Sequence, residues 1–419
     1  FQVTASGEPA SGGYSVSLDG TLGQVSVSAS GRTDALFDPG ILDLEVQATG
    51  PDFAAVVALA GIDDAARTPF AVSGHVRWEG FPVTLDEVAV TIGDNRIALD
   101  GTIGAPPTLM GTDFRFDAEG PDVSAVSVLA GFGLPAESFQ IHGQLVRLEG
   151  GIGIQGVEAV VGPAVAKVDG ILGDPPGYAG TDLQVAAQGP NLVSFSELAG
   201  VALPALPFEI AGRLAPEGDS ITLENVSARL GPNSARVEGT VGAVAGFIGT
   251  DVHLSIEGPD LSWLEGPTGF SDLPRKPYRV EGGLAVERTG YRLDGINAIV
   301  GEVTAKVDGR VGPLPDLAGT NIQIVAEGPD FSIPASLAGA AGVPPDPFRI
   351  EGGLRMANGS FELEGVQARV GGARATVSGR IAATSDLVGT ELTIDAAGPD
   401  ASDFGSLLRQ TSLPSAPFA

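Results

Sequence analysis

Acidic residues recur in two short motifs, Gly-Thr-Asp and Gly-Pro-Asp, and turn carboxylates are typical calcium ligands. Each motif offers a single carboxylate, whereas calcium takes about six to eight oxygen ligands. The Asp or Asn after Gly-Pro is instead a good helix N-cap, because its side chain accepts a hydrogen bond from the first helical turn. We therefore predict no metal site, and helix N-caps at Asp52, Asp122, Asn191, Asp260, Asp330 and Asp400.

The sequence shows no cluster of the other residue types that commonly act in catalysis or ligand binding. His75, His142 and His253 stand singly in segments of alternating apolar and polar residues, as outward-facing strand residues do. The absence of cysteine excludes disulfides, thiolate metal sites and cysteine nucleophiles. The glycine pairs 282–283 and 352–353 lie within strand-like segments and not before a helix, so they indicate kinks or close approaches and not phosphate loops. We predict no catalytic residues and no cofactor, and expect that the protein is not an enzyme.

The net charge and the hydropathy argue against several other classes of protein, among them nucleic-acid-binding proteins. The 52 acidic and 23 basic residues give a formal net charge of -29. Such a charge argues against binding to nucleic acid and against bulk electrostatic attraction to anionic lipid headgroups. No apolar run approaches the roughly 20 residues needed to cross a bilayer. No targeting segment is visible.

The chain repeats itself at a period of about 70 residues, which decides the architecture. Gly-Pro-Asp/Asn begins at Gly50, Gly120, Gly189, Gly258, Gly328 and Gly398, with spacings of 70, 69, 69, 70 and 70 residues. An aromatic residue keeps the same period at Phe70, Phe139, Phe208, Tyr278, Phe348 and Phe418, as does Gly-Thr at Gly111, Gly180, Gly249, Gly319 and Gly389. We expect six repeats, over residues 1–69, 70–138, 139–207, 208–277, 278–347 and 348–419, as part of a longer array.

Each repeat has the pattern of four strands and one short helix. Residues 182–188, 208–214 and 235–241 alternate apolar and polar side chains, which predicts half-buried strands. A helix of about ten residues is expected after Gly-Pro-Asp, because apolar residues follow and Gly61, Gly131, Gly200 or Gly339 then ends it.

The remaining strand changes phase. Ile221 and Leu223 are odd-numbered, whereas Val226, Ala228 and Leu230 are even-numbered, so one apolar face requires a β-bulge near Glu224–Asn225. Bulges bend a strand, which predicts a curved sheet. The same shift recurs between Leu85 and Val88, Ile154 and Val157, Leu293 and Ile296, and Leu363 and Val366.

The apolar face is the candidate site. Six repeats of four strands would present one continuous apolar face that short helices cannot cover. We expect a mainly β fold, an elongated, curled antiparallel β-sheet that forms an open hydrophobic groove for lipid tails. The predicted lining residues are Leu183, Val185, Phe208, Ile210, Leu214, Leu223, Val226, Leu230, Val237, Val241, Ile322, Ile324, Phe348, Ile350 and Leu354.

An alternative is a structural array, a β-solenoid or surface stalk with a closed dry core and no ligand. In a solenoid, equivalent residues such as Phe139 and Phe208 would stack about 4.8 Å apart. In a meander they are four strands apart, about 19 Å.

The residue order GTDLxVxAxGPD…LxxLAGxxLPxxPFxIxGxL…YxLxxVxAxVGxxxAxVxGxVG resembles the repeat of the AsmA-like (TamB-like) family of bacterial envelope bridge-like lipid transfer proteins. The resemblance covers essentially the whole chain and includes no catalytic signature. It implies a periplasmic β-groove, anchored in the inner membrane through a segment not present here, that moves phospholipids to the outer membrane. The implied partners are phospholipid or other acyl-chain lipids and membrane-anchored proteins or domains outside this sequence.

Overall fold

The computed structural model describes residues 2–37, 39–54, 67–126, 135–175, 178–196, 203–242, 246–265, 273–313, 317–337, 345–357, 359–382, 389–399 and 416–418. The structure is mainly β, with 68% strand, 5% helix and an open antiparallel sheet of 24 strands, which confirms the prediction of a mainly β fold with an antiparallel sheet. The chain divides into two compact units, Phe1–Gly218 and Asp219–Ala419. The boundary between them falls within the predicted repeat 208–277.

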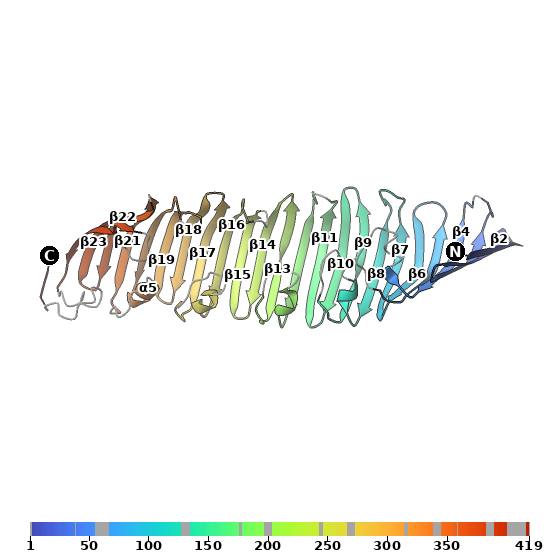
Figure 1. The fold of residues 1–419 in the computed structure, drawn as a ribbon, viewed down its shortest axis with the longest axis horizontal. Coiled ribbons are helices and arrows are strands. Elements are labelled where there is room, and N and C mark those ends of the chain that lie inside the picture. The colour runs from blue at the N-terminus through green and yellow to red at the C-terminus, as the bar shows by residue number, and fades with distance from the viewer. Residues whose placement is uncertain are drawn as a thin grey trace. The chain divides into compact units, whose positions relative to one another are not determined.

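The first unit contains thirteen strands, and each pairs antiparallel with the next along the chain (Figure 1). The strands are β1 (Gln2–Ala10), β2 (Gly13–Leu22), β3 (Val25–Thr33), β4 (Leu42–Gly50), β5 (Phe70–Trp78), β6 (Val83–Ile92), β7 (Asn95–Ile103), β8 (Asp113–Gly120), β9 (Phe139–Leu148), β10 (Gly151–Val161), β11 (Ala164–Gly173), β12 (Asp182–Gly189) and β13 (Phe208–Glu217).

The second unit contains eleven strands with the same consecutive pairing. A β-solenoid would place equivalent strands of successive repeats side by side, and the described strands do not pair in that way. The strands are β14 (Ser220–Leu230), β15 (Asn233–Val241), β16 (Asp251–Gly258), β17 (Tyr278–Glu287), β18 (Gly290–Val300), β19 (Val303–Val311), β20 (Asn321–Gly328), β21 (Phe348–Ala357), β22 (Ser360–Val370), β23 (Ala373–Ala382) and β24 (Glu391–Ala397).

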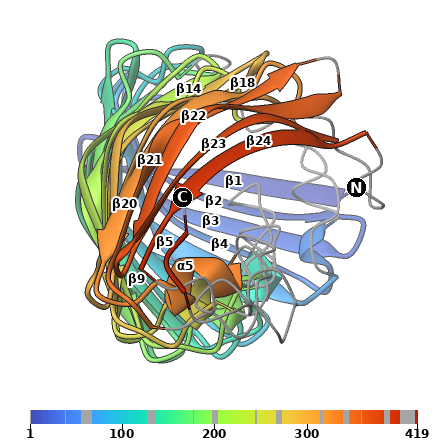
Figure 2. The same ribbon diagram turned by 90° about the vertical axis from the view of Figure 1, so that its left-hand side faces the viewer.

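The predicted bulge is confirmed in β14, where the register with β15 shifts between Leu223 and Val226. Asn225 takes a left-handed backbone conformation there, with φ of 50°. In Figure 2 the strands β22, β23 and β24 bend along their length. The register shifts at the four other predicted places as well, between Leu85 and Val88, Ile154 and Val157, Leu293 and Ile296, and Leu363 and Val366.

In three of the bulges, an aspartate of the neighbouring strand accepts a hydrogen bond from a backbone nitrogen of the bulge. Asp169 Oδ1 accepts a hydrogen bond from the backbone nitrogen of Gly156 at 2.6 Å, and Asp100 and Asp308 bond the bulges of β6 and β18 in the same way. These aspartates each precede a glycine, as the Asp-Gly of residues 169–170 illustrates. These hydrogen bonds between aspartate and bulge were not predicted from the sequence. The recurrence of Asp-Gly at three equivalent repeat positions could have indicated them.

Four helical segments with described bounds follow Gly-Pro-Asp or Gly-Pro-Asn. Three are 3₁₀ turns, η2 (Val123–Val126), η3 (Val193–Phe195) and η4 (Leu261–Leu264), and one is an α-helix, α5 (Ser332–Leu337), at the end of β20 and β21 (Figure 1). The other residues expected to form the ten-residue helix lie outside the described residues. The glycines expected to end it, Gly61, Gly131, Gly200 and Gly339, lie outside the described residues.

Three of the predicted N-caps accept the expected bond, and Asn191 accepts a similar bond although Leu192 is the N-cap of η3. Asp122, Asp260 and Asp330 accept from the backbone nitrogen and hydroxyl of the serine two residues on, and Asn191 accepts from the Val193 nitrogen at 3.0 Å. The prediction for Asp52 is not borne out, because its Oδ1 is buried without a hydrogen-bond partner. Position 54 is alanine, so the serine hydroxyl is missing there. Asp400 lies outside the described residues.

The recurring aromatic residue and the glycine of Gly-Pro-Asp form one cross-strand contact. Phe208 pairs with Gly189, and a Cβ at Gly189 would lie 2.7 Å from the Phe208 ring. The ring also packs on Phe195 of η3 at a centroid distance of 5.8 Å. Any larger residue at the glycine would displace the ring, so the two sequence anchors keep the same period because they are in contact.

At one of these aromatic–glycine contacts, a neighbouring buried side chain lacks a hydrogen-bond partner, which gives a testable prediction. Asn95 Oδ1 is buried without a hydrogen-bond partner close to Phe139, whereas Asn233 Oδ1 accepts a bond from the Tyr278 hydroxyl at 3.3 Å. Phe139→Tyr should therefore supply the missing donor and raise the free energy of unfolding by about 0.5–1.5 kcal/mol in chemical denaturation.

The matched control is Phe208→Tyr, because Ala164 stands opposite Phe208 and offers no acceptor side chain. There the new hydroxyl should be left without a side-chain partner and lower stability by about 1 kcal/mol or more. Equal effects of the two substitutions would contradict the proposed pairing with Asn95.

Candidate functional site

The apolar side chains of successive strands lie on one face because the register aligns them. In the second unit Val237 pairs with Val226 on one side and with Leu254 on the other. Directly paired residues of an antiparallel sheet point to the same face. The bulge keeps the two halves of β14 in phase, since Ile221 pairs with Val241 beyond the shift.

The paired residues form rows that cross the strands. One row is mostly small, another is mostly branched, and the two are adjacent along every strand because their members are two residues apart. The small row of the second unit is Ala228, Ala235, Ile256, Val280, Ala298, Ala305, Ala326, Ile350, Ala368, Ala375 and Ala396. The branched row is Val226, Val237, Leu254, Gly282, Ile296, Val307, Ile324, Gly352, Val366, Val377 and Ile394.

The first unit has the same arrangement. Leu183 pairs with Gly170 and Leu214, Val185 with Val168 and Gly212, and Ala187 with Ala166 and Ile210. Phe208 and Phe348 are buried at the strand ends that carry the helical segments. The other predicted lining residues are half-buried, apart from Ile210, which is 37% exposed: Leu183, Val185, Leu214, Leu223, Val226, Leu230, Val237, Val241, Ile322, Ile324, Ile350 and Leu354.

The accessible area of the chain is larger than that of compact bodies of the same mass. The protein exposes 24403 Å². Two separate compact bodies, each of half the mass of 42.2 kDa, would expose roughly 18,000 Å² in total. The difference does not depend on how the two units are placed.

Glycines on the apolar face are positions of close approach, as predicted for the pairs 282–283 and 352–353. A Cβ at Gly282 would lie 2.7 Å from the Cα of Ile296, and one at Gly352 would lie 2.7 Å from the Cα of Val366. These glycines stand opposite the bulges of β18 and β22. They allow the bulged strand to bend toward its neighbour.

The Gly-Thr motif has a structural role that sequence reasoning missed. The buried Thr181 hydroxyl donates to the Tyr178 carbonyl at 2.6 Å and accepts from the Gly173 nitrogen at 2.9 Å, which fixes the turn between β11 and β12. Thr250 and Thr320 make the same two bonds. The constant spacing of eight residues between the glycine and the threonine was the available signal.

The opposite face is polar and carries ion pairs. Arg213 binds Asp182 with Nε to Oδ1 at 2.5 Å and Nη2 to Oδ2 at 2.6 Å, and this hydrogen bonding lowers the pKa of Asp182. Lys167 Nζ lies 2.7 Å from Glu158 Oε2 and lowers the pKa of that carboxyl through its hydrogen bond and charge. These ionised side chains keep the face hydrated.

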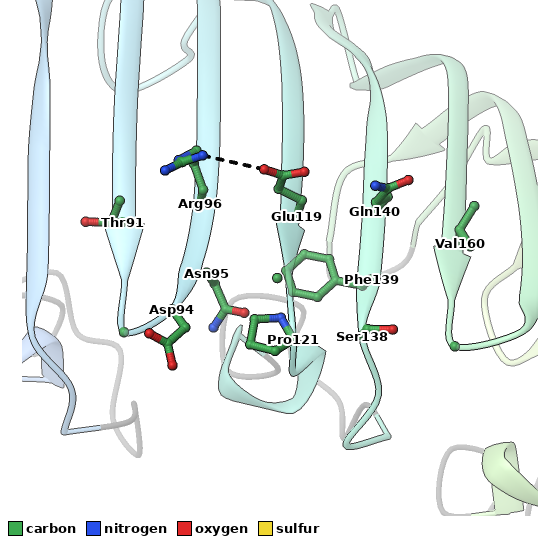
Figure 3. A pocket seen from close by; sticks show the side chains of 13 residues that line it. Thr91, Asp94, Asn95, Arg96, Glu119, Pro121, Ser138, Phe139, Gln140 and Val160 are labelled. Atoms are coloured by element: carbon green, nitrogen blue, oxygen red, sulfur yellow. Dashed lines mark ion pairs between the residues drawn. The ribbon is translucent and has the colours of Figure 1, made fainter.

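A hollow of about 600 Å³ lies on the first unit at the ends of β7, β8 and β9. Figure 3 shows Thr91, Arg96, Glu119 and Gln140 in a row across the strands, with Asn95 and Phe139 nearer the strand ends. Arg96 Nη1 lies 3.7 Å from Glu119 Oε1, so the two charges face each other. The lining contains no cysteine or histidine.

The histidines are strand residues that the structure does not bring together. His75 Nε2 lies 2.5 Å from Asp43 Oδ1, and His253 Nε2 lies 4.0 Å from Glu281 Oε1. His142 pairs with Asp117 of β8 and with Glu158 of β10. Among the described residues, no group of three or more His, Cys, Asp or Glu side chains is placed to hold a metal ion.

Comparison with known proteins gives no relative: no family model, no curated protein and no solved structure matches this chain. Within the described ranges, no helix has the length and apolarity required to cross a membrane.

Proposed function

We propose that the apolar face binds the acyl chains of lipids, and that the chain is a groove segment, built from repeats of about 70 residues, of an envelope protein that moves phospholipids between inner and outer membranes. The observation that carries the proposal is the continuous rows of apolar side chains that remain half-buried. A face of this kind costs about 25 cal/mol for each Å² of apolar surface left in water. Lipid tails remove that cost.

Acyl chains fit the chemistry of the face. Each buried methylene group contributes about 0.8 kcal/mol without any directional bond. Rows of alanine and branched residues offer area but no hydrogen-bond donors, so tails can shift along the rows while headgroups stay in water. Binding should therefore depend on many residues at once, with no dominant contact. Transport, the envelope location and the membrane-anchored partners are supported by the family resemblance of the repeat.

A structural array without ligand is the second candidate. Consecutive antiparallel pairing disfavours a β-solenoid, but a stalk whose face closes on itself is compatible with a repetitive sheet. The two candidates differ in one respect: a stalk has a dry core, whereas a groove holds lipid after purification.

Native mass spectrometry and lipid extraction of the purified chain test this difference. We expect co-purifying phospholipid in amounts of at least one molecule per chain, removed by detergent and regained on incubation with vesicles. The lipids that co-purify should carry acyl chains of several lengths, because tail binding is not specific. A chain that carries no lipid and takes up none would contradict the proposal.

A further inference from the structure

One rim of the first unit carries bulky apolar side chains on its turns. This apolar rim comprises Phe37, Phe81, Leu109, Met110 and Tyr178, all exposed, with Phe37 at 91%. They belong to the turns 34–41, 79–82, 104–112 and 173–181. Strand pairing places these turns at the same end of the sheet, because Leu42 pairs with Trp78, Val83 with Ile103, and Gly151 with both Leu148 and Gly173.

The two-residue turns of the first unit carry no such residues at either rim: Ser11–Gly12 and Glu149–Gly150 lie at the apolar rim, and three others lie at the opposite rim. The turns of the opposite rim are Gly23–Gln24, Gly93–Asp94 and Gly162–Pro163. The apolar side chains at the first rim are therefore not a general property of the turns of this sheet.

Two residues of the apolar rim have a backbone conformation that favours glycine or asparagine over bulky side chains. Leu109 and Tyr178 have φ values of 57° and 52°, a left-handed conformation that disfavours bulky side chains. The turn itself is fixed by the threonine hydroxyl, as Thr112 accepts from the Gly104 nitrogen at 2.9 Å. In the second unit Phe247 and Leu317 repeat this, with φ of 55° and 53°. The fold does not require these side chains, which points to a role outside the chain.

We propose that the apolar rim docks on the surface of a lipid bilayer with neutral headgroups. Leu109 and Tyr178 lie on turns four strands apart, about 19 Å. A protein partner needs a continuous interface of roughly 1,000 Å², whereas a fluid bilayer can solvate each separated side chain. Aromatic residues also favour the membrane interface. The net charge of -29 selects zwitterionic over anionic headgroups.

Rim docking is independent of acyl chains in the groove, since no rim residue belongs to the rows of the apolar face. The cysteine-free sequence allows a single reactive site to be introduced anywhere. Phe37→Cys and Tyr178→Cys, each labelled with the environment-sensitive dye NBD, would report on the rim. Pro163→Cys, in an exposed turn of the opposite rim, carries the same dye as the matched control.

With phosphatidylcholine vesicles, we expect the two rim labels to gain several-fold in NBD intensity and shift to the blue, while the control stays unchanged. Adding anionic phosphatidylglycerol should weaken the response. A response that is equal at all three sites, or absent at the rim, would overturn the proposal. A response that depends on protein concentration without vesicles would overturn it in favour of a second copy as the partner.

A combined variant separates docking from lipid uptake. Phe37→Ser, Phe81→Ser, Met110→Ser and Tyr178→Ser together should abolish co-flotation with phosphatidylcholine vesicles, while lipid already bound to the purified chain is retained. Unchanged flotation of this variant, with its far-UV circular dichroism intact, would contradict rim docking and leave the proposal for the groove standing.

Discussion

Val185→Asp is expected to lower the amount of bound lipid several-fold while leaving the fold intact. Val185 lies on β12 between Val168 and Gly212, in a row of the apolar face, and is half-buried. An aspartate placed against acyl chains would have to lose hydration, at a cost of about 2.5–3.5 kcal/mol by analogy with insertion into hydrocarbon. That cost corresponds to a loss of about 60-fold or more in local affinity.

The same residue should matter little for folding. Without lipid, water reaches a half-buried carboxylate on an open face, so the free energy of unfolding should fall by no more than about 1 kcal/mol. In a closed dry core the same substitution would leave an unpaired charge and cost several kcal/mol. Lipid extraction with quantitative mass spectrometry measures the first quantity, and thermal unfolding followed by circular dichroism measures the second.

Gln184→Asp is the matched control. It adds the same charge at the adjacent position of β12, which is exposed on the polar face. Lipid content should not change. Val237→Asp repeats the test in the second unit, where Val237 lies between Val226 and Leu254. If both valine variants unfold at much lower temperature and the wild type carries no lipid, the face is a structural core and not a lipid site.

Local periodicity predicted most of the strands because side-chain alternation depends only on neighbouring residues. The change of phase between Leu223 and Val226 was enough to locate a bulge, since only an extra residue keeps both valine and leucine on one face. The candidate lining residues followed from the same alternation. Whether those side chains line a groove depends on how the sheet curls, which alternation alone does not determine.

Other features depend on contacts between residues far apart or on details of a turn. Asp52 and Asp122 stand in the same motif, yet Asp122 bonds to Ser124 and Asp52 has Ala54 instead. The left-handed conformation of Tyr178 could not be read from the residue type, because glycine or asparagine would be expected there. Its cause is the turn that Thr181 closes, a hydrogen bond that spacing suggests only once the strands are known.

Gly170→Ala is expected to be a strongly disruptive small substitution on the apolar face of the first unit. Gly170 lies between Ile154 and Leu183 with φ of 132°, and an added Cβ would lie 2.0 Å from the Asp182 carbonyl oxygen of β12. Real Cβ atoms do not approach an oxygen that closely, so β12 must move. We expect a loss of about 3 kcal/mol or more, because backbone strain and lost pairing with β12 add together.

Gly180→Ala is the control that separates backbone strain from the steric clash of an added Cβ. Gly180 also has a positive φ, 78°, but an added Cβ would have no neighbour within 4 Å, so only the conformational cost of about 1–2 kcal/mol remains. Hydrogen exchange is the suitable measurement, since repetitive sheets open locally and exchange reports the opening of individual strands. Amides of β11 and β12 should lose protection in Gly170→Ala and keep it in Gly180→Ala.

A third glycine connects strand approach to the apolar face. Gly309 of the second unit repeats the geometry of Gly170, with φ of 126° and a Cβ position 2.2 Å from the Asn321 carbonyl oxygen. If strand approach at these glycines shapes the face, Gly309→Ala should reduce bound lipid as well as protection of β19 and β20, although it adds only one apolar methyl group. Lost protection with unchanged lipid content would show that the face tolerates local separation of its strands.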